Sequence, residues 1–268
     1  MSLLIQPARQ EDFLSCREQV FERNFLQHGI GSLAEKSQHA ILKNYYCPNP
    51  AEQEINLGPF VADIANREGV TEIQTRGFGS MCKKLGFFLQ HYPVRVIYPA
   101  AAVKWGVWVD PQTGETVARN RSPKKTAAYG IFRELYSVLD LLWPAGFSVT
   151  IALLECEEYR LLNGRGPAHK KGAQRLELIP SAMLGEIVLH TPRDLLQFLP
   201  DGLPELFTSG DLQKSIHLNH RGISYLISVL RRLELIEQVG KVFVALPLAY
   251  FGMRVSVAYA AAGGLFGT

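Results

Sequence analysis

The stretch that decides the fold is Val61-Ala62-Asp63-Ile64-Ala65-Asn66-Arg67-Glu68-Gly69-Val70-Thr71-Glu72-Ile73-Gln74-Thr75. Two β-prone runs flank a short polar turn, which predicts two antiparallel strands. Glu72 and Gln74 lie two residues apart and share one face of the second strand, while Ile73 points to the other face. The tight turn brings Asp63 beside Glu72. Neighbouring carboxylates repel unless a positive group lies between them, and such oxygen ligands suit Mg²⁺ or Mn²⁺ better than zinc.

The segments around this hairpin predict an α/β protein with a mixed sheet flanked by helices, because strands alternate with helices along the chain. The expected elements are helices within residues 10–45, a β-hairpin over 53–64, a helix over 77–91, a strand over 94–99, a hairpin around 110–114, a helix over 126–142 and a strand over 147–154.

The second half of the chain predicts a separate domain. Residues 163–175 are rich in glycine and contain four basic and no acidic residues, which is typical of an exposed loop. From Thr191 onward, three helices and a Gly-centred hairpin follow in the order of a winged helix-turn-helix. We therefore expect domains over 1–163 and 190–268, the latter ending in a small-residue tail. Residues 164–189 form a basic linker and bridging segment, of which 176–189 either extend the first domain or lead to the second.

Composition excludes several classes of protein. The chain has 268 residues, 47% hydrophobic and 20% charged, so it is neither disordered nor fibrous. It shows no secretory signal and no apolar span long enough for a membrane helix. Four separated cysteines without a C-x-x-C pair argue against zinc fingers and disulfides, and they predict a cytoplasmic protein. No glycine pattern of a nucleotide-binding loop is present, so we expect no nucleotide cofactor. Because no apolar span is long enough, we also expect no membrane partner.

The decisive stretch resembles the PD-(D/E)XK nuclease superfamily, and within it the archaeal-type Holliday junction resolvases and related restriction-like nucleases. The matching features are Asp63 on one strand, Glu-x-Gln on the next, and a preceding helix that carries Glu35. The likeness covers about residues 30–110 and implies a restriction-endonuclease-like domain. It implies that Asp63, Glu72 and the carbonyl of Ile73 bind Mg²⁺ or Mn²⁺, and that Glu35 completes or orients the water shell of the metal.

The activity implied by this resemblance is metal-dependent hydrolysis of phosphodiester bonds in DNA, directed to branched structures and carried out by a homodimer. The catalytic residues would be Glu35, Asp63, Glu72 and Gln74. Gln74 stands where the family has a lysine, and glutamine can align a water but cannot carry a proton or a positive charge. The alternative is a non-catalytic DNA-binding or regulatory protein that retains a nuclease fold. A nuclease acting on RNA would have the same metal site.

The residues of the site also have plain structural interpretations. Glu35 forms a capping box with Ser32 at a helix start. Asp63 and Glu72 could be ordinary strand-end carboxylates. His39 lies four residues after Glu35 on the same helix face, which would place it near the site, and the alternative that we favour is a surface histidine.

Local clusters of basic residues indicate where DNA would bind, because 28 Lys+Arg against 25 Asp+Glu give a net charge of only +3. The helix from Arg221 to Leu235 would be a recognition helix, or instead part of a protein-docking module. The other clusters are expected in loops, where a solvated surface is the alternative. The candidates for nucleic-acid binding are Arg76, Lys83, Lys104, Arg119, Arg121, Lys124, Lys125, Lys170, Lys171 and Arg221.

Overall fold

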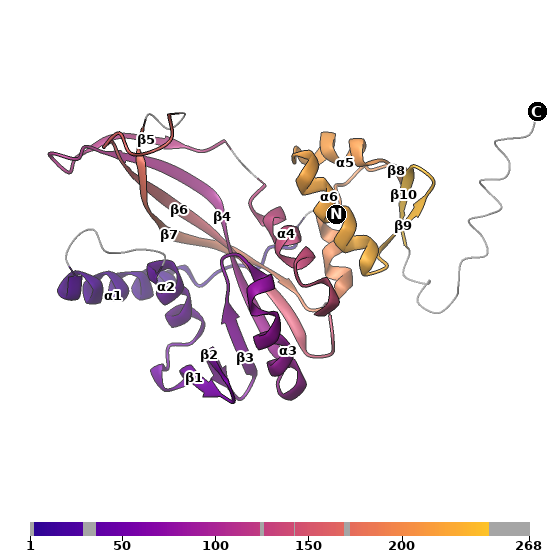
Figure 1. Cartoon of the computed structure of the whole chain (residues 1–268), viewed down its shortest axis with the longest axis horizontal. Helices are drawn as coiled ribbons and strands as arrows, with labels where there is room; N and C mark the ends of the chain where they lie inside the picture. Colours follow the sequence, from indigo (N-terminus) through magenta and orange to yellow (C-terminus); the bar gives the residue numbers. More distant parts are fainter. Residues whose placement is uncertain (1–2, 29–35, 124–125, 142, 169–171, 247–268) are drawn as a thin grey trace, which may run out of the picture.

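The computed structural model describes residues 3–28, 36–123, 126–141, 143–168 and 172–246 (Figure 1). The strands of its large sheet are β1 (Gln53–Leu57), β2 (Phe60–Asn66), β3 (Gly69–Ile73), β4 (Val94–Val109), β5 (Thr116–Arg121), β6 (Phe147–Leu161) and β7 (Gln174–Leu189). The strand order is β1-β2-β3-β4-β6-β7, with β5 paired to β4. Parallel and antiparallel pairs both occur, so the predicted mixed sheet is confirmed.

The first three strands form an antiparallel meander, as the hairpin patterns predict. Gly69 has φ of 125°, and a Cβ atom there would lie 2.3 Å from the carbonyl oxygen of Pro93. Only glycine fits this close approach between the start of β3 and the start of β4. This contact fixes the backbone conformation at Gly69, where the turn ends, and so sets the register of β2 and β3.

Helical crossovers connect the parallel strands. The first consists of η2 (Phe78–Met81) and α3 (Cys82–His91), and the second of η3 (Ala128–Gly130), α4 (Ile131–Tyr136) and η4 (Leu139–Leu141). The prediction of one continuous helix over 126–142 is therefore wrong. The hydroxyl of Ser137 donates a hydrogen bond to the carbonyl of Glu134 at 2.6 Å, and such side-chain contacts compete with the helical backbone pattern.

Two strands, β4 and β6, are much longer than expected, and a third long strand, β7, was not predicted as a strand. β4, β6 and β7 have 16, 15 and 16 residues, and with β5 they form an arm that extends beyond the helices at the upper left of Figure 1. Residues 174–189 pair with β6 along this arm, so they belong to the large sheet and are not a linker. The reason is that Met183, Ile187 and Leu189 are buried in the cores of the sheet, which a bridging segment would leave exposed.

Two hydrophobic cores cover opposite faces of the large sheet. Helices α1 (Gln10–His28) and α2 (Lys36–Tyr46) bury Phe13, Ile41 and Leu42 against one face. Helices α3 and α4 cover the other face, and their core continues without interruption into the C-terminal elements.

The C-terminal region contains helices followed by a hairpin. Its elements are η6 (Pro192–Phe198), β8 (Leu206–Phe207), α5 (Ser209–Ile216), α6 (His220–Arg232), β9 (Ile236–Val239) and β10 (Val242–Ala245). Thr208 caps α5 and Asn219 caps α6, each accepting a hydrogen bond from a backbone amide of the first turn. The buried side chains of α6 pack toward α4, where the rings of Tyr136 and Tyr225 lie 5.1 Å apart.

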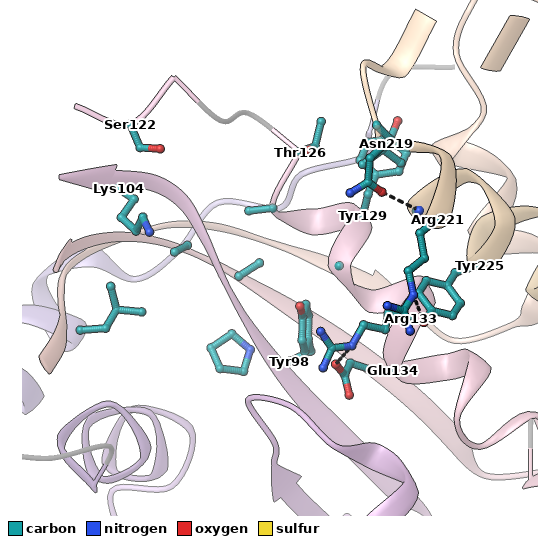
Figure 2. Close-up of a pocket in the computed structure, with 18 of the residues that line it drawn as sticks. Tyr98, Lys104, Ser122, Thr126, Tyr129, Arg133, Glu134, Asn219, Arg221 and Tyr225 are labelled. Carbon is teal, nitrogen blue, oxygen red and sulfur yellow. Dashed lines mark hydrogen bonds and ion pairs between the residues drawn. The ribbon is translucent and has the colours of Figure 1, made fainter. Parts of the chain in front are cut away.

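A cavity of about 1100 Å³ separates the arm of the sheet from the first turn of α6 (Figure 2). All four cysteines are free, in agreement with the expected lack of disulfides. Among the described residues, no helix is long and apolar enough to cross a membrane. Glu35, Ser32 and the expected tail over 260–268 lie outside the described residues.

Candidate active site

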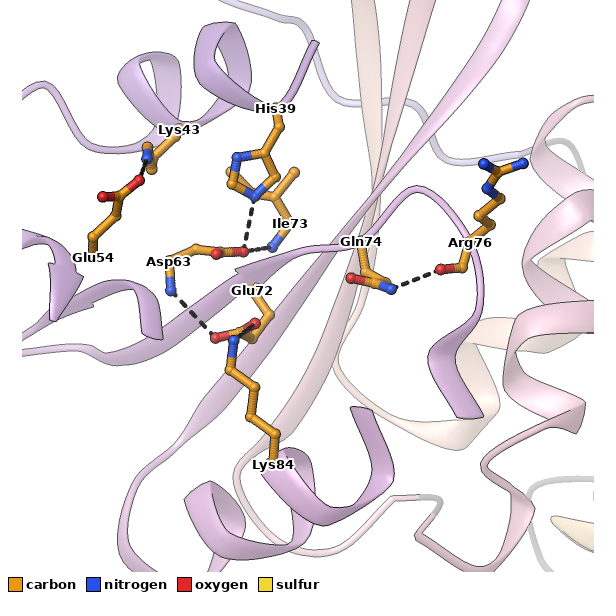
Figure 3. Close-up of polar contacts among 9 residues, drawn as sticks. All are labelled: His39, Lys43, Glu54, Asp63, Glu72, Ile73, Gln74, Arg76 and Lys84. Atoms are coloured by element: carbon orange, nitrogen blue, oxygen red, sulfur yellow. Dashed lines mark hydrogen bonds and ion pairs between the residues drawn. The ribbon is translucent and has the colours of Figure 1, made fainter. Parts of the chain in front are cut away.

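The structure brings Asp63 and Glu72 together on two adjacent strands, β2 and β3. Ile64 pairs with Thr71, so Asp63 and Glu72 occupy the next positions along β2 and β3. The backbone amide of Asp63 lies 3.3 Å from Oε1 of Glu72, and the amide of Ile73 donates to Oδ2 of Asp63 at 2.8 Å (Figure 3). Asp63 and Glu72 are therefore neighbours, as predicted, and each carboxylate accepts a hydrogen bond from a backbone amide of the other strand.

Two basic side chains approach this pair from helices on opposite faces of the sheet. His39 on α2 places Nε2 at 3.2 Å from Oδ2 of Asp63. Lys84 on α3 places Nζ at 2.5 Å from Oε2 of Glu72. The Glu72 side chain is only 4% exposed, so water cannot compensate its negative charge. Lys84 supplies the positive counter-charge.

The two carboxyl groups have different proton affinities. Burial raises the pKa of Glu72 to about 7, the charge of Asp63 adds to this effect, and Lys84 opposes it. Burial also raises the pKa of Asp63, but the contact with His39, the Ile73 amide and the charge of Lys84 outweigh it. The pKa of Asp63 therefore lies below its usual value. Paired carboxyls whose pKa values are driven apart are characteristic of functional sites.

The other predicted site residues are placed differently. The amide of Gln74 donates to the carbonyl of Arg76 at 2.6 Å, and in Figure 3 the Gln74 side chain points away from the carboxylate pair. The Ile73 side chain is buried in the core beneath α1 and α2. Glu35, expected as the third acidic residue, lies outside the described residues. Asp63 and Glu72 are thus the predicted acidic residues that the structure brings together.

His39 and Lys84 take roles that the sequence did not predict. Of the two interpretations of His39, the favoured one, a surface residue, is corrected: His39 lies at the site and contacts Asp63, because α2 packs directly on the sheet. Lys84 precedes the buried Phe88 by four residues, so it lies on the inward face of α3. A lysine on the apolar face of an amphipathic helix requires a buried acidic partner, and this signal could have identified it.

The carboxylate pair has the ligand chemistry of a magnesium site. Mg²⁺ is bound in proteins through one or two carboxylates and retains several waters, so Asp63 and Glu72 would suffice as protein ligands. The structure describes no cluster of three or more His, Cys, Asp or Glu side chains arranged around a metal, within residues 3–28, 36–123, 126–141, 143–168 and 172–246. Lys84 contacts Oε2 of Glu72, so a cation would bind beside the ammonium group or displace it.

Most predicted nucleic-acid contacts on the arm have partners within the protein. Lys104, Arg119 and Arg121 lie on strands β4 and β5, which corrects their assignment to loops. Lys104 pairs with Glu158 at 2.9 Å, and Arg119 pairs with Glu157 at 3.0 Å while stacking on the Trp105 ring. These carboxylates neutralise part of the charge that clusters in the sequence.

The remaining candidates are distributed over three regions. Arg76 is exposed after β3, Lys83 is exposed on α3, and Arg221 is exposed in the first turn of α6. Lys124, Lys125, Lys170 and Lys171 lie outside the described residues.

Comparison with known proteins gives a family without an assigned activity. The family described as "Domain of unknown function (DUF8091)" matches residues 36–190, a segment that begins with α2 and includes β1 through β7. An uncharacterized protein of Treponema pallidum (strain Nichols) is 26% identical over 187 residues, covering 69% of this chain and 74% of the relative. No solved structure matches the chain. The matched segment contains the carboxylate pair and both basic residues that contact it.

Proposed function

The chain belongs to the DUF8091 family, and from its carboxylate pair we propose that it is a divalent-metal-dependent endonuclease that hydrolyses phosphodiester bonds in DNA. The proposal includes a restriction-endonuclease-like fold for the sheet domain and a winged helix for the C-terminal elements. The element order supports the first, since α2, three antiparallel strands, α3 and a parallel strand follow one another. Two capped helices followed by a hairpin support the second.

The single observation that carries this proposal is the contact of Asp63 and Glu72 with Lys84 beside them. Superfamily members have a lysine where this chain has Gln74, and glutamine has no positive charge. Lys84 reaches the same carboxylate from α3, so the site regains an ammonium group through a different element. Acidic and basic groups of this kind, partly buried between a sheet and its helices, are the parts that phosphodiester hydrolysis requires.

In the proposed mechanism, Asp63 and Glu72 are the residues that would hold a Mg²⁺ or Mn²⁺ ion. When bound, the metal would supply Lewis acidity toward a phosphate oxygen and make a water more acidic. His39 and the Ile73 amide orient the Asp63 carboxylate through Oδ2. Lys84 opposes the rise in the pKa of Glu72 that burial causes, so it favours the charged form, and its ammonium group would stabilise charge on the phosphate. Gln74 is hydrogen-bonded to the loop backbone and would have to rotate to reach a water.

The direct test of the proposed function is cleavage of branched and linear DNA in Mn²⁺. The wild-type protein is expected to nick the DNA, and Asp63→Ala and Glu72→Ala are expected to lower the rate by at least about a hundredfold. Glu68→Ala, on the exposed turn between the same strands, is the matched control and should retain the wild-type rate. Equal activity of the wild-type, Asp63→Ala and Glu72→Ala proteins would contradict the proposal.

One observation favours a second candidate function. The ion pair between Lys84 and Glu72 already neutralises the buried carboxylate, and Gln74 points away from it. This arrangement is also that of a non-catalytic DNA-binding protein with a nuclease fold. DNA binding without cleavage by wild-type protein, at every Mn²⁺ and Mg²⁺ concentration tried, would favour this second function.

A further inference from the structure

The cavity between the arm of the sheet and α6 combines three walls that are far apart in the sequence (Figure 2). Strands β4, β6 and β7 form one wall. Ser122 and residues within 126–134 form the second, and the turn between α5 and α6 with the first turns of α6 forms the third. The cavity adjoins the loop that follows β3, because Oε2 of Glu134 accepts hydrogen bonds from the amides of Gly77 and Phe78 at 2.6 and 3.2 Å.

The charge of the cavity is positive where its side chains are accessible. Its basic side chains are Lys104, Arg133, Arg175 and Arg221, and its acidic ones are Glu134 and Glu158. Both acids are engaged within the protein, Glu134 by the two loop amides and Glu158 by Lys104 and Arg160. Polyanions are therefore attracted to this cavity, because its carboxylates are already compensated.

Two arginines provide the accessible positive charge. The Arg133 side chain is 64% exposed, and its nearest carboxylate is Glu134 at 3.5 Å. Arg221 is exposed, and its Nε donates to the hydroxyl of Tyr225 at 2.9 Å. Among the described residues, no carboxylate forms an ion pair with Arg221. This hydrogen bond orients the Arg221 guanidinium and leaves its terminal nitrogens available for phosphate.

Aromatic side chains line the same cavity. Tyr98, Tyr129 and Tyr225 contribute to its walls, and Figure 2 shows Tyr225 beside Arg221. Basic groups that track a phosphate backbone, combined with aromatic rings on which bases stack, are the features of sites for single-stranded nucleic acid. The volume of about 1100 Å³ is just above the range of small-molecule pockets, about 300–1,000 Å³. A ligand larger than a single small molecule, such as a few nucleotides of one strand, therefore suits it.

We propose that this cavity binds a single-stranded segment of DNA, with Arg133 and Arg221 contacting phosphates and Tyr225 stacking on a base. The inference rests on the proposed function, because it takes the single-stranded segment to be part of the DNA that the enzyme cleaves. The substrate would then be DNA with a single-stranded branch. Binding itself requires neither the metal nor the carboxylate pair. The two proposals can therefore be tested separately.

The test is fluorescence anisotropy of a labelled oligothymidylate in EDTA, with a duplex of equal length as comparison. Wild-type protein is expected to bind the single strand more tightly than the duplex. Arg133→Ala combined with Arg221→Ala should weaken single-strand binding by roughly tenfold or more. The slope of log affinity against log salt should fall by about 1.4, because each phosphate that an arginine neutralises contributes about 0.7 to that slope.

The matched control is Arg231→Ala, which removes an exposed arginine from the same helix outside the cavity and should keep wild-type affinity. The inference is overturned if the double variant binds like wild type, if Arg231→Ala weakens binding as much, or if the duplex is preferred. Absence of wild-type binding also overturns it, and tighter binding of an oligouridylate overturns the assignment to DNA.

Asp63→Asn should bind normally in EDTA. Binding without any cleavage by wild type would sustain the cavity and reject the endonuclease.

Discussion

Single residues determine whether a carboxylate can remain charged inside the sheet. The Glu72 side chain is 4% exposed and that of Lys84 is 22% exposed, so their ion pair is largely shielded from water. Removing one partner of such a pair leaves an uncompensated charge, which costs far more than losing a surface salt bridge. The adjacent Lys83 is exposed and offers a comparison at the neighbouring position of the same helix.

We predict that Lys84→Met lowers the free energy of unfolding by about 2–4 kcal/mol, whereas Lys83→Met changes it by less than about 0.5 kcal/mol. Urea denaturation followed by circular dichroism measures both. Adding Glu72→Gln to Lys84→Met should restore part of the stability, because the unpaired charge is then gone. Equal effects of Lys83→Met and Lys84→Met would show that the ion pair does not stabilise the fold.

At the scale of the element, a turn positions the site. Asp63 and Glu72 meet because β2 and β3 are joined by a short turn that ends at Gly69, where the backbone touches the carbonyl of Pro93. The contrasting glycine is Gly86 in α3, where an added Cβ would meet nothing within 4 Å. The two positions therefore differ in space and in backbone conformation.

Gly69→Ala should destabilise the protein by at least about 2 kcal/mol and disrupt the pairing of Asp63 with Glu72, because it combines an unfavourable φ with a clash. Gly86→Ala should stabilise it by about 0.5–1 kcal/mol, since alanine is the better helix former. Thermal unfolding of the two variants gives the sign of each effect. A Gly69→Ala variant as stable as wild type would contradict the close approach to Pro93.

At the scale of the whole molecule, one core joins the two predicted domains. Buried residues of β3, α3, α4 and β6 belong to the same cluster as those of η6, α5, α6 and β10. The arm has a different source of stability, an ionic network in which Glu158 on β6 contacts Lys104 on β4, Arg160 on β6 and Arg175 on β7. Ion pairs therefore connect β4, β6 and β7 in the part of the sheet that lies beyond the apolar core.

This network predicts how stability depends on pH. Burial raises the pKa of Glu158, but Lys104 and Arg160 outweigh it and hold the pKa below its usual value. A carboxyl with a lowered pKa contributes stability above the pKa of the unfolded chain, about 4.3, and that stability is lost as pH falls through the folded pKa. The free energy of unfolding should therefore fall below about pH 5. Glu158→Gln should be less stable than wild type at pH 7 and should show a smaller fall.

Urea denaturation at a series of pH values between about 3 and 7 tests this prediction. Glu68→Gln, on the exposed turn between β2 and β3, is the control for the loss of one negative charge. A fall in stability that is identical in wild type and Glu158→Gln would show that the network does not contribute to acid sensitivity.

The local sequence pattern was sufficient to predict the features that depend on residues close together in the chain. The alternation of apolar residues and the turn at 66–69 determine that β2 and β3 pair, so the meeting of Asp63 with Glu72, nine residues apart, followed from sequence. The same reasoning located α3, the start of β4 and the helices of the C-terminal region. It failed for the 126–142 helix, where a side chain interrupts the backbone pattern.

Only tertiary structure decided which distant side chains complete the site. His39 and Lys84 reach the carboxylates from helices on opposite faces of the sheet, and Arg133 and Arg221 line one cavity although they lie on different helices far apart in the chain. Such contacts depend on how helices pack across a sheet and on how far β4, β6 and β7 extend. Packing at long range leaves no periodic signal in the local sequence, whereas a tight turn and two alternating strands do.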